Sequence, residues 1–291
     1  MNGLSHLWAR SARFLVLATI LAGLIGGGCQ GVSGPLVGLG EEAAEVTDEP
    51  ALVRVAACWA SLPLVSELVA EYGRLSPRTS FDVVPVGSAV AQDLLATGQA
   101  DVAVVGVDPA TPADEGGGPG AEVLALDAVA VVVHPSVGIH TLSAGQLAAL
   151  YAGEYLRWDE LGGADEAVEV LVHTPESLGR AVFERVIMGD TGVSSFAIIV
   201  PHDRAVIEYV AEHPGAIGYV SNAYVDDRVR VVAIDEHRPT AAEIRSGRYP
   251  LGYPLVFLTT PDAPREAQRW INHARGNRGR HVIERRYSLP G

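Results

Sequence analysis

Short apolar runs alternate with amphipathic segments through residues 51–291. Mostly apolar runs predict buried strands, and segments that repeat apolar residues three or four positions apart predict helices with one buried face. The predicted strands lie at residues 52–57, 81–86, 101–107, 125–133, 168–172 and 216–220. Because strands and helices alternate along the chain, the pattern predicts an α/β fold in which mixed sheets are flanked by helices.

The apolar strands at residues 125–133 and 217–220 flank a self-contained series of strand and helix segments. We expect both strands to cross between two lobes. Residues 51–132 and 219–291 would then form a discontinuous lobe I, and residues 133–218 would form lobe II. This arrangement predicts a monomer with a ligand cleft between its lobes.

Three of the strand–turn–helix units carry a serine at or near the predicted helix start, at Ser61, Ser88 and Ser177. The first N–H groups of a helix lack backbone partners, and the helix dipole adds partial positive charge there, so such ends suit an anion. Near Ser177, His173 and Arg180 bring potential positive charge. Each serine taken alone is an ordinary helix cap. Their shared build favours a cage for a small oxyanion at the carboxyl edge of the strands.

The N-terminus has the pattern of an export signal. Two arginines precede an apolar run at residues 14–25, and three glycines lead to Cys29. The run is shorter than the ~20 residues of a comfortable membrane span. Small residues before a cysteine are similar to a bacterial lipoprotein signal, so residues 1–28 are predicted to be removed and Cys29 to carry lipid. The alternative is a simple secretory signal or uncleaved anchor with an incidental cysteine. Residues 29–50 predict a flexible acidic tether.

Composition excludes several classes of function. The net charge of −14 disfavours nucleic acid as a partner, because phosphate repulsion would not be offset. All 21 basic residues are arginine, which excludes a Schiff-base lysine and a Walker phosphate loop. No nucleophile-elbow motif surrounds Ser88 or Ser177, and the nine histidines lack zinc-ligand spacing. We therefore expect no catalysis, no cofactor and no metal.

Several stretches match one family in order and spacing. They are Ala60-Ser61-Leu62-Pro63, Gly87-Ser88, residues 98–103, residues 142–162, and Gly215-Ala216-Ile217-Gly218-Tyr219-Val220. Over residues 52–290 the chain resembles the phosphate-binding lipoproteins of ABC transporters, within the type-2 periplasmic binding proteins. The resemblance implies a two-lobed fold that closes on its ligand and delivers it to a membrane permease. It also implies that Ser61, Leu62, Ser88 and Ser177 lie in the ligand site.

The chain departs from the family pattern in its third ligand loop. There the family has an arginine followed four residues later by Ser-Gly-Thr, whereas this chain has His173 and then Ser177. An arginine binds an oxyanion through two charge-assisted hydrogen bonds, so its replacement removes a strong contact. The family also has an aspartate where this chain has Gly106, with Asp108 two residues further on. Asp108 and Arg180 remain candidate ligand-binding residues, although a helix residue such as Arg180 can equally face solvent.

The leading hypothesis is a solute-binding lipoprotein, held by lipid on the extracytoplasmic face of the cell membrane. It would capture a small oxyanion, phosphate first, for the permease of an ABC importer. The alternative hypothesis is a lipoprotein that keeps this fold but serves as a sensor or interaction module with a degenerate ligand site. The altered third loop favours the alternative, and the remaining matches favour the first.

Overall fold

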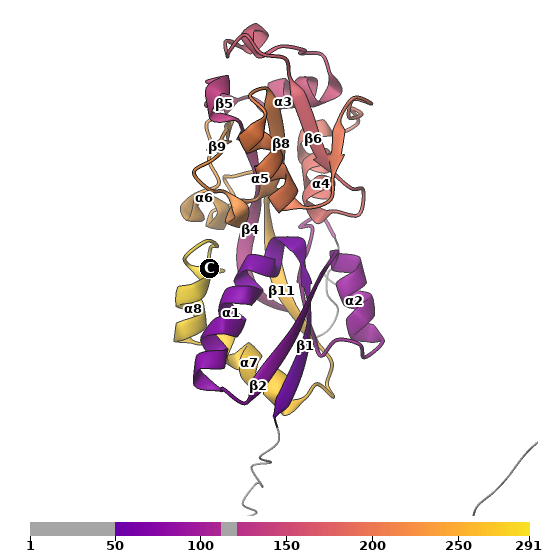
Figure 1. Cartoon of the computed structure of the whole chain (residues 1–291), viewed down its shortest axis with the longest axis vertical. Helices are drawn as coiled ribbons and strands as arrows, with labels where there is room; N and C mark the ends of the chain where they lie inside the picture. The colour runs from indigo at the N-terminus through magenta and orange to yellow at the C-terminus, as the bar shows by residue number, and fades with distance from the viewer. Residues whose placement is uncertain (1–49, 112–120) are drawn as a thin grey trace, which may run out of the picture. The chain divides into compact units, whose positions relative to one another are not determined.

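The computed structural model describes residues 50–111 and 121–291. The predicted signal peptide, Cys29 and nearly all of the predicted tether lie outside these ranges. Within them, no helix combines the length and the apolar character needed to cross a bilayer. Strands and helices alternate along the described chain, which confirms the predicted α/β class (Figure 1).

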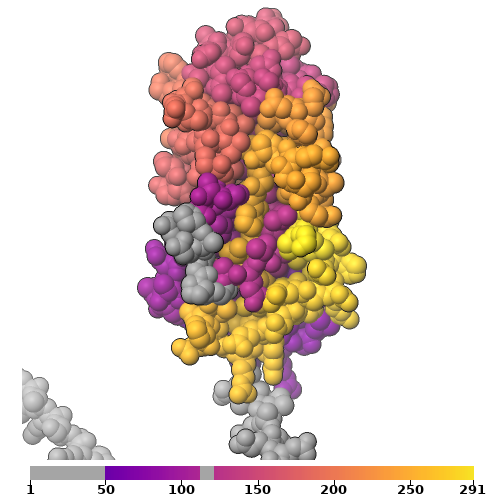
Figure 2. All heavy atoms as spheres, turned by 180° about the vertical axis from the view of Figure 1, so that it is seen from behind, coloured from indigo at the N-terminus to yellow at the C-terminus, as the bar shows by residue number. Residues whose placement is uncertain are grey.

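The first group of strands forms a mixed sheet. Its elements are β1 (Ala51–Cys58), α1 (Leu62–Leu75), β2 (Thr79–Val86), α2 (Ser88–Ala96), β3 (Val102–Gly106), β11 (Gly252–Thr259), α7 (Arg265–Arg275) and α8 (Asn277–Ile283). The strand order is β2-β1-β3-β11, and only β11 runs antiparallel to its neighbour β3. The N-terminal and C-terminal parts of the described chain therefore share one sheet. In the space-filling view of Figure 2, yellow atoms from the end of the chain lie beside purple atoms from the start of the described chain.

Helices cover both faces of this sheet because side chains alternate along its strands. Val55 faces a core that includes Leu68 of α1 and Trp270 of α7. Ala56, the next residue, faces the opposite core with Ala91 of α2. The apolar runs of the sequence are therefore strands buried on both sides, as expected for parallel strands between two helix layers.

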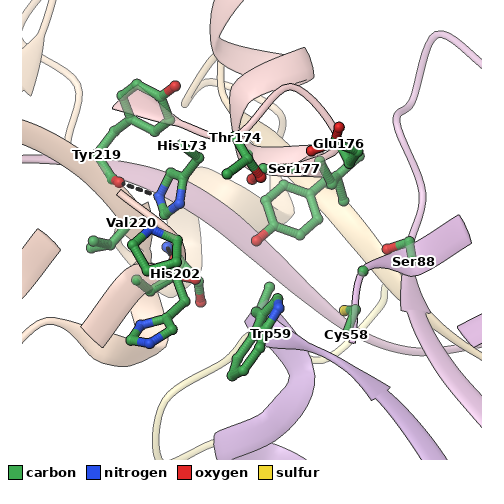
Figure 3. Close-up of a pocket in the computed structure, with 18 of the residues that line it drawn as sticks. Cys58, Trp59, Ser88, His173, Thr174, Glu176, Ser177, His202, Tyr219 and Val220 are labelled. Atoms are coloured by element: carbon green, nitrogen blue, oxygen red, sulfur yellow. Dashed lines mark hydrogen bonds between the residues drawn. The ribbon is translucent and has the colours of Figure 1, made fainter. Parts of the chain in front are cut away.

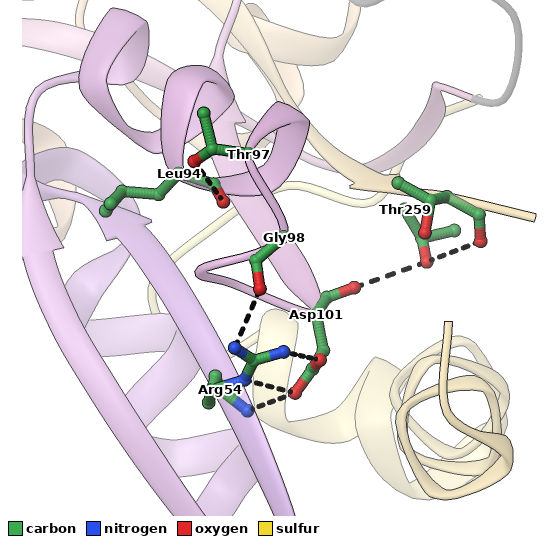
Figure 4. A network of polar contacts seen from close by, with 7 residues as sticks. Arg54, Leu94, Thr97, Gly98, Asp101 and Thr259 are labelled. Carbon is green, nitrogen blue, oxygen red and sulfur yellow. Dashed lines mark hydrogen bonds and ion pairs between the residues drawn. The ribbon is translucent and has the colours of Figure 1, made fainter. Parts of the chain in front are cut away.

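An ion pair ties β1 to the loop that precedes β3 (Figure 4). The backbone N–H of Arg54 donates to Asp101 Oδ2 at 2.8 Å, and its guanidinium donates to both carboxylate oxygens. A further guanidinium N–H donates to the Gly98 carbonyl at 2.7 Å. Burial acts to raise the pKa of Asp101, but the hydrogen bonds and charge of Arg54 hold that pKa below its ordinary value. The contact fixes the register of β3 against β1, the strand whose carboxyl end reaches the site described below.

The second group of strands lies beyond the midpoint of β4 (Glu122–Val133) (Figure 1). Its elements are β5 (Thr141–Leu142), α3 (Ala144–Ala152), β6 (Glu169–His173), α4 (Leu178–Phe183), β7 (Ile198–Val200), α5 (Asp203–Glu212), β8 (Ala216–Ser221), β9 (Arg230–Val231), β10 (Ala233–Ile234) and α6 (Ala241–Arg245). A capping box of Ser143 and Gln146 opens α3. The side chain of His202 caps α5, because it accepts a hydrogen bond from the backbone N–H of Ala205.

β4 is the one strand that both groups share. Its first half, to Ala128, pairs antiparallel with β11, and its second half, from Val129, pairs antiparallel with β8. β9 pairs with the end of β4, and β10 pairs with β5, so residues 230–234 join the second group. This pairing favours a return to the first group at β11. The division at residues 51–132, 133–218 and 219–291 stays a prediction.

Asp127 is buried where β4 passes from one partner strand to the other. Its Oδ2 accepts hydrogen bonds from the hydroxyls of Ser221, at 2.6 Å, and Tyr253, at 2.8 Å. Its Oδ1 accepts one from the backbone N–H of Ala128 at 2.8 Å. Burial raises the pKa of Asp127 to about 7, and these hydrogen bonds offset only part of that rise.

The raised pKa makes the free energy of unfolding depend on pH. A carboxyl that holds its proton more tightly when folded stabilises the protein fully below its unfolded pKa of about 3.9. That stabilisation is lost as pH rises through the folded value of about 7. We therefore expect Asp127→Asn to flatten the fall in stability between about pH 4 and pH 7, by a few kcal/mol at most.

Urea unfolding of the parent and the variant at several pH values measures this effect. Asp82→Asn is the matched control, because Asp82 is exposed on β2 and the substitution should leave the parent's pH dependence unchanged. Parallel stability curves for the parent and Asp127→Asn would contradict the assignment.

Candidate functional site

A cavity of about 250 Å³ lies where strand ends of the two groups face each other (Figure 3). The carboxyl ends of β1 and β2 reach it from one side, and those of β6 and β7 from the other. Its lining residues are Cys58, Trp59, Ala60, Gly87, Ser88, Val90, His173, Thr174, Glu176, Ser177, Leu178, Gly179, Pro201, His202, Asp203, Tyr219, Val220, Ser221 and Tyr253. Because β1 and β2 point toward β6 and β7, the turns that follow these four strands surround one cavity although they are far apart in the sequence.

Three of the predicted site residues meet in this cavity, namely Ser88, Ser177 and His173. Ser88 is the first residue of α2, and Ser177 immediately precedes α4. His173 ends β6 and is only 3% exposed. Its Nε2 lies 2.9 Å from the carbonyl oxygen of Tyr219, and because a carbonyl can only accept, this nitrogen carries the proton.

In the first predicted loop, Ala60 lines the cavity, but the two predicted ligand residues, Ser61 and Leu62, do not. Ser61 is fully buried, and its hydroxyl donates to the carbonyls of Cys58, at 2.9 Å, and Val104, at 3.0 Å. These bonds fasten the turn after β1 to β3. Leu62 lines a separate surface hollow beside Ile207. In this structure the loop positions α1 and the adjoining turn, and its two predicted contacts are turned away from the cavity.

The two charged residues predicted to compensate for the altered loop are engaged elsewhere. Arg180 donates through Nε to Glu184, and through Nη1 to the carbonyl of His173, each at 2.8 Å. Asp108 accepts two hydrogen bonds from Arg185, the shorter at 2.7 Å. Neither Arg180 nor Asp108 lines the cavity. Both belong to ion pairs near the cavity rather than in it.

Gly106, at the position where the family has an aspartate, is closed off by its neighbours. A Cβ atom there would lie 2.3 Å from Cδ2 of Leu178 and 3.3 Å from the ring of Tyr253. A larger side chain would therefore require Leu178 to move. The packing of the altered third loop against the end of β3 gives a physical reason why an acceptor is missing at this position.

Cys58 ends β1 and lines the cavity. Burial raises the pKa of its thiol, while hydrogen bonds from Ser61, from the backbone of Gly106 and from Ser88 act to lower it. With only 4% of its surface exposed, Cys58 packs as a small buried residue.

Sequence reasoning missed Trp59, His202 and Asp203, all of which line the cavity. The rings of Trp59 and His202 lie 5.1 Å apart, centre to centre, and bring the two groups of strands into contact. Asp203 Oδ1 accepts a short hydrogen bond, 2.5 Å, from the backbone N–H of Ser221. The sequence nevertheless contained an indication of His202 and Asp203. Residues 198–206 form another strand–turn–helix unit, of the same build as the three units that carry Ser61, Ser88 and Ser177.

The cavity's electrostatics differ from those of an arginine-lined anion site. Among the described lining residues, the imidazoles of His173 and His202 are the side chains that can become positive. Two carboxyl groups, of Glu176 and Asp203, lie in the same lining. Across residues 50–111 and 121–291, His, Cys, Asp and Glu side chains form no group of three that could hold a metal ion. The chemistry on offer is hydrogen bonding to a small solute by hydroxyl, imidazole and backbone groups.

Known proteins share both the sequence and the fold of this chain. It is 30% identical to the phosphate-binding protein PstS of Bacillus subtilis over 152 residues, which cover 52% of this chain and only 50% of that protein. It is 20% identical to the phosphate-binding protein PstS of Borreliella burgdorferi over 249 residues, 81% of this chain and 89% of that protein.

A solved structure agrees with these matches. A phosphate-bound putative substrate-binding protein of a phosphate ABC transporter from Clostridium perfringens superposes with a TM-score of 0.75, covering 82% of this chain and 99% of that one. At 19% identity, this likeness shows the fold, a type-2 periplasmic binding protein with mixed sheets flanked by helices. The family model described as a PBP superfamily domain matches residues 44–274. The chain therefore belongs to the PBP superfamily, as its resemblance to the phosphate-binding proteins predicted.

Proposed function

We propose that this protein is a solute-binding protein that captures a small oxyanion, phosphate first, for an ABC importer. The observation that carries the proposal is the convergence of Ser88, Ser177 and His173 on one cavity between two groups of strands. The relatives named above as phosphate-binding proteins support the choice of phosphate. The chain acts by binding and release, and no step of catalysis is needed.

Capture requires the two groups of strands to close on the solute. Ser88 and Trp59 come from the first group, and His173, Ser177 and His202 come from the second. A solute that touches both groups binds the closed arrangement more tightly than the open one, so it shifts the equilibrium toward closure. The protein acts as a monomer of two lobes, and a permease recognises the closed form.

The protein is held at the extracytoplasmic face of the cell membrane. Residues 1–28 direct export, Cys29 carries the lipid, and the acidic residues that follow keep the folded part away from the bilayer. A single acyl chain binds a membrane only marginally, so a stable anchor needs more than one chain.

A second candidate function, a sensor or interaction module with a degenerate site, is favoured by one observation. The guanidinium of Arg180 is committed to Glu184 and to the His173 carbonyl instead of the cavity. A charged oxyanion would then depend on imidazole and hydroxyl groups alone. Binding measurements on the serines separate the two functions.

Removal of either hydroxyl should weaken phosphate binding. A hydrogen bond to a charged group contributes about 1.5 kcal/mol or more, so Ser88→Ala and Ser177→Ala should each raise the Kd for phosphate by about tenfold. Isothermal titration calorimetry with inorganic phosphate measures the change. Ser66→Ala is the control, because this exposed serine of α1 bonds only to the Leu62 carbonyl and lies outside the cavity. Absence of phosphate binding to the parent would favour the sensor or interaction module.

The mature protein should begin at a lipid-modified Cys29. Mass spectrometry of the N-terminal peptide from membrane-extracted protein should show the added mass of acyl chains on this residue. Cys29→Ser should move the protein from the membrane to the soluble fraction, while Cys58→Ser, at a buried position, should leave it at the membrane. An unmodified Cys29 or cleavage at another residue would overturn the anchor.

A further inference from the structure

The cavity is larger than an inorganic oxyanion requires. Its volume of about 250 Å³ corresponds to roughly eight water molecules at ~30 Å³ each. A tetrahedral oxyanion such as phosphate has only five non-hydrogen atoms. Specific pockets enclose most of the surface of their ligand, so a ligand that fills this cavity carries a further group beyond its anionic head.

The charges around the cavity disfavour a doubly charged anion. The carboxyl groups of Glu176 and Asp203 line it, and the buried carboxyl of Asp127 lies behind Ser221. Arg180, on the adjacent helix, is paired with Glu184. A buried charge without a partner is costly, so two negative charges would be poorly compensated here. One negative charge can be met by the hydroxyls of Ser88 and Ser177 or Thr174.

The remaining wall of the cavity is apolar. Figure 3 shows the Trp59 ring between Cys58 and His202, and the side chains of Val90, Leu178, Val220 and Pro201 add hydrocarbon to the same lining. The indole ring of Trp59 is half-buried and can pack against a flat group. Cys58, which is 4% exposed, adds a sulfur atom to this lining.

We propose that the natural solute is a small organic oxyanion with a single negative charge and a flat apolar body that packs against Trp59. This inference rests on the proposed function, because it assigns a ligand class to the same cavity. The head group lies at Ser88 and Ser177, and the body occupies the space beside Trp59 and Val220. Trp59 is thereby a specificity-determining residue that sequence motifs do not reveal.

Calorimetric titration of the purified full-length chain with three probes tests the inference. Inorganic phosphate supplies the head alone, methylphosphonate replaces one of its oxygens by a small group, and phenylphosphonate adds a flat apolar body. The titrations are run at about pH 5, below the second pKa of phosphate-type groups, so that each probe carries one negative charge. Burial of a phenyl ring should make phenylphosphonate bind at least about tenfold more tightly than the other two. Trp59→Leu should remove most of that preference, measured as the ratio of the Kd values for inorganic phosphate and phenylphosphonate in the same variant. Phe196→Leu, an exposed aromatic residue outside the cavity, is the matched control.

The outcomes separate this inference from the proposed function. If phosphate binds as tightly as phenylphosphonate, the ligand class is wrong while oxyanion capture stands. If phenylphosphonate is preferred equally by the parent and by Trp59→Leu, the body lies elsewhere and the role of Trp59 is wrong. If none of the probes binds, both oxyanion capture and the inference fail. The ranking of probes on the parent needs no variant, so misfolding of Trp59→Leu cannot hide a negative result.

Discussion

The continuous pairing of β4 is the constraint on which the rest of the structure depends. One half of this strand is held by β11 and the other by β8, and both neighbours run antiparallel to it. Because β3 runs antiparallel to β11 whereas β6 runs parallel to β8, the parallel strands β1, β2 and β3 run opposite to β6, β7 and β8. Their carboxyl ends face each other, so the turns after β1, β2, β6 and β7 surround a single cavity. Asp127, Ser221 and Tyr253 join the three strands by hydrogen bonds at this crossing.

Local patterns predicted most of the fold. The apolar runs became β1, β2, β3, β4, β6 and β8, and a local capping box at Ser143 opens α3. These features are decided within a few residues, by side-chain period and by a cap that satisfies its own backbone. The return of the chain to its first sheet was harder to place. Pairing of β9 and β10 depends on partners about 90 residues away, which no local pattern specifies.

The candidate site was only partly predictable, because each polar side chain has several possible hydrogen-bond or ion-pair partners in the folded chain. Ser88 and Ser177 reached the cavity, whereas the hydroxyl of Ser61 found two carbonyls in the sheet. Arg180 lies one helical turn before Glu184 and pairs with it. Trp59 carried no motif, and its place at the cavity follows from the register of β1 alone. Sequence thus located the edge where the site forms, and tertiary packing selected the groups that face it.

The polar groups of this cavity are largely engaged before any solute arrives. Asp203 accepts from Ser221, His173 donates to Tyr219, and Cys58 takes donors at the ends of β1 and β3. Such internal hydrogen bonds fix the geometry of the site. They also leave fewer hydrogen-bond donors free to bind a highly charged ligand. An anion site with few free donors gains affinity by burying apolar surface, and Trp59 offers that surface. The same fold can therefore shift from recognition by charge toward recognition by shape while its strand pairing stays unchanged.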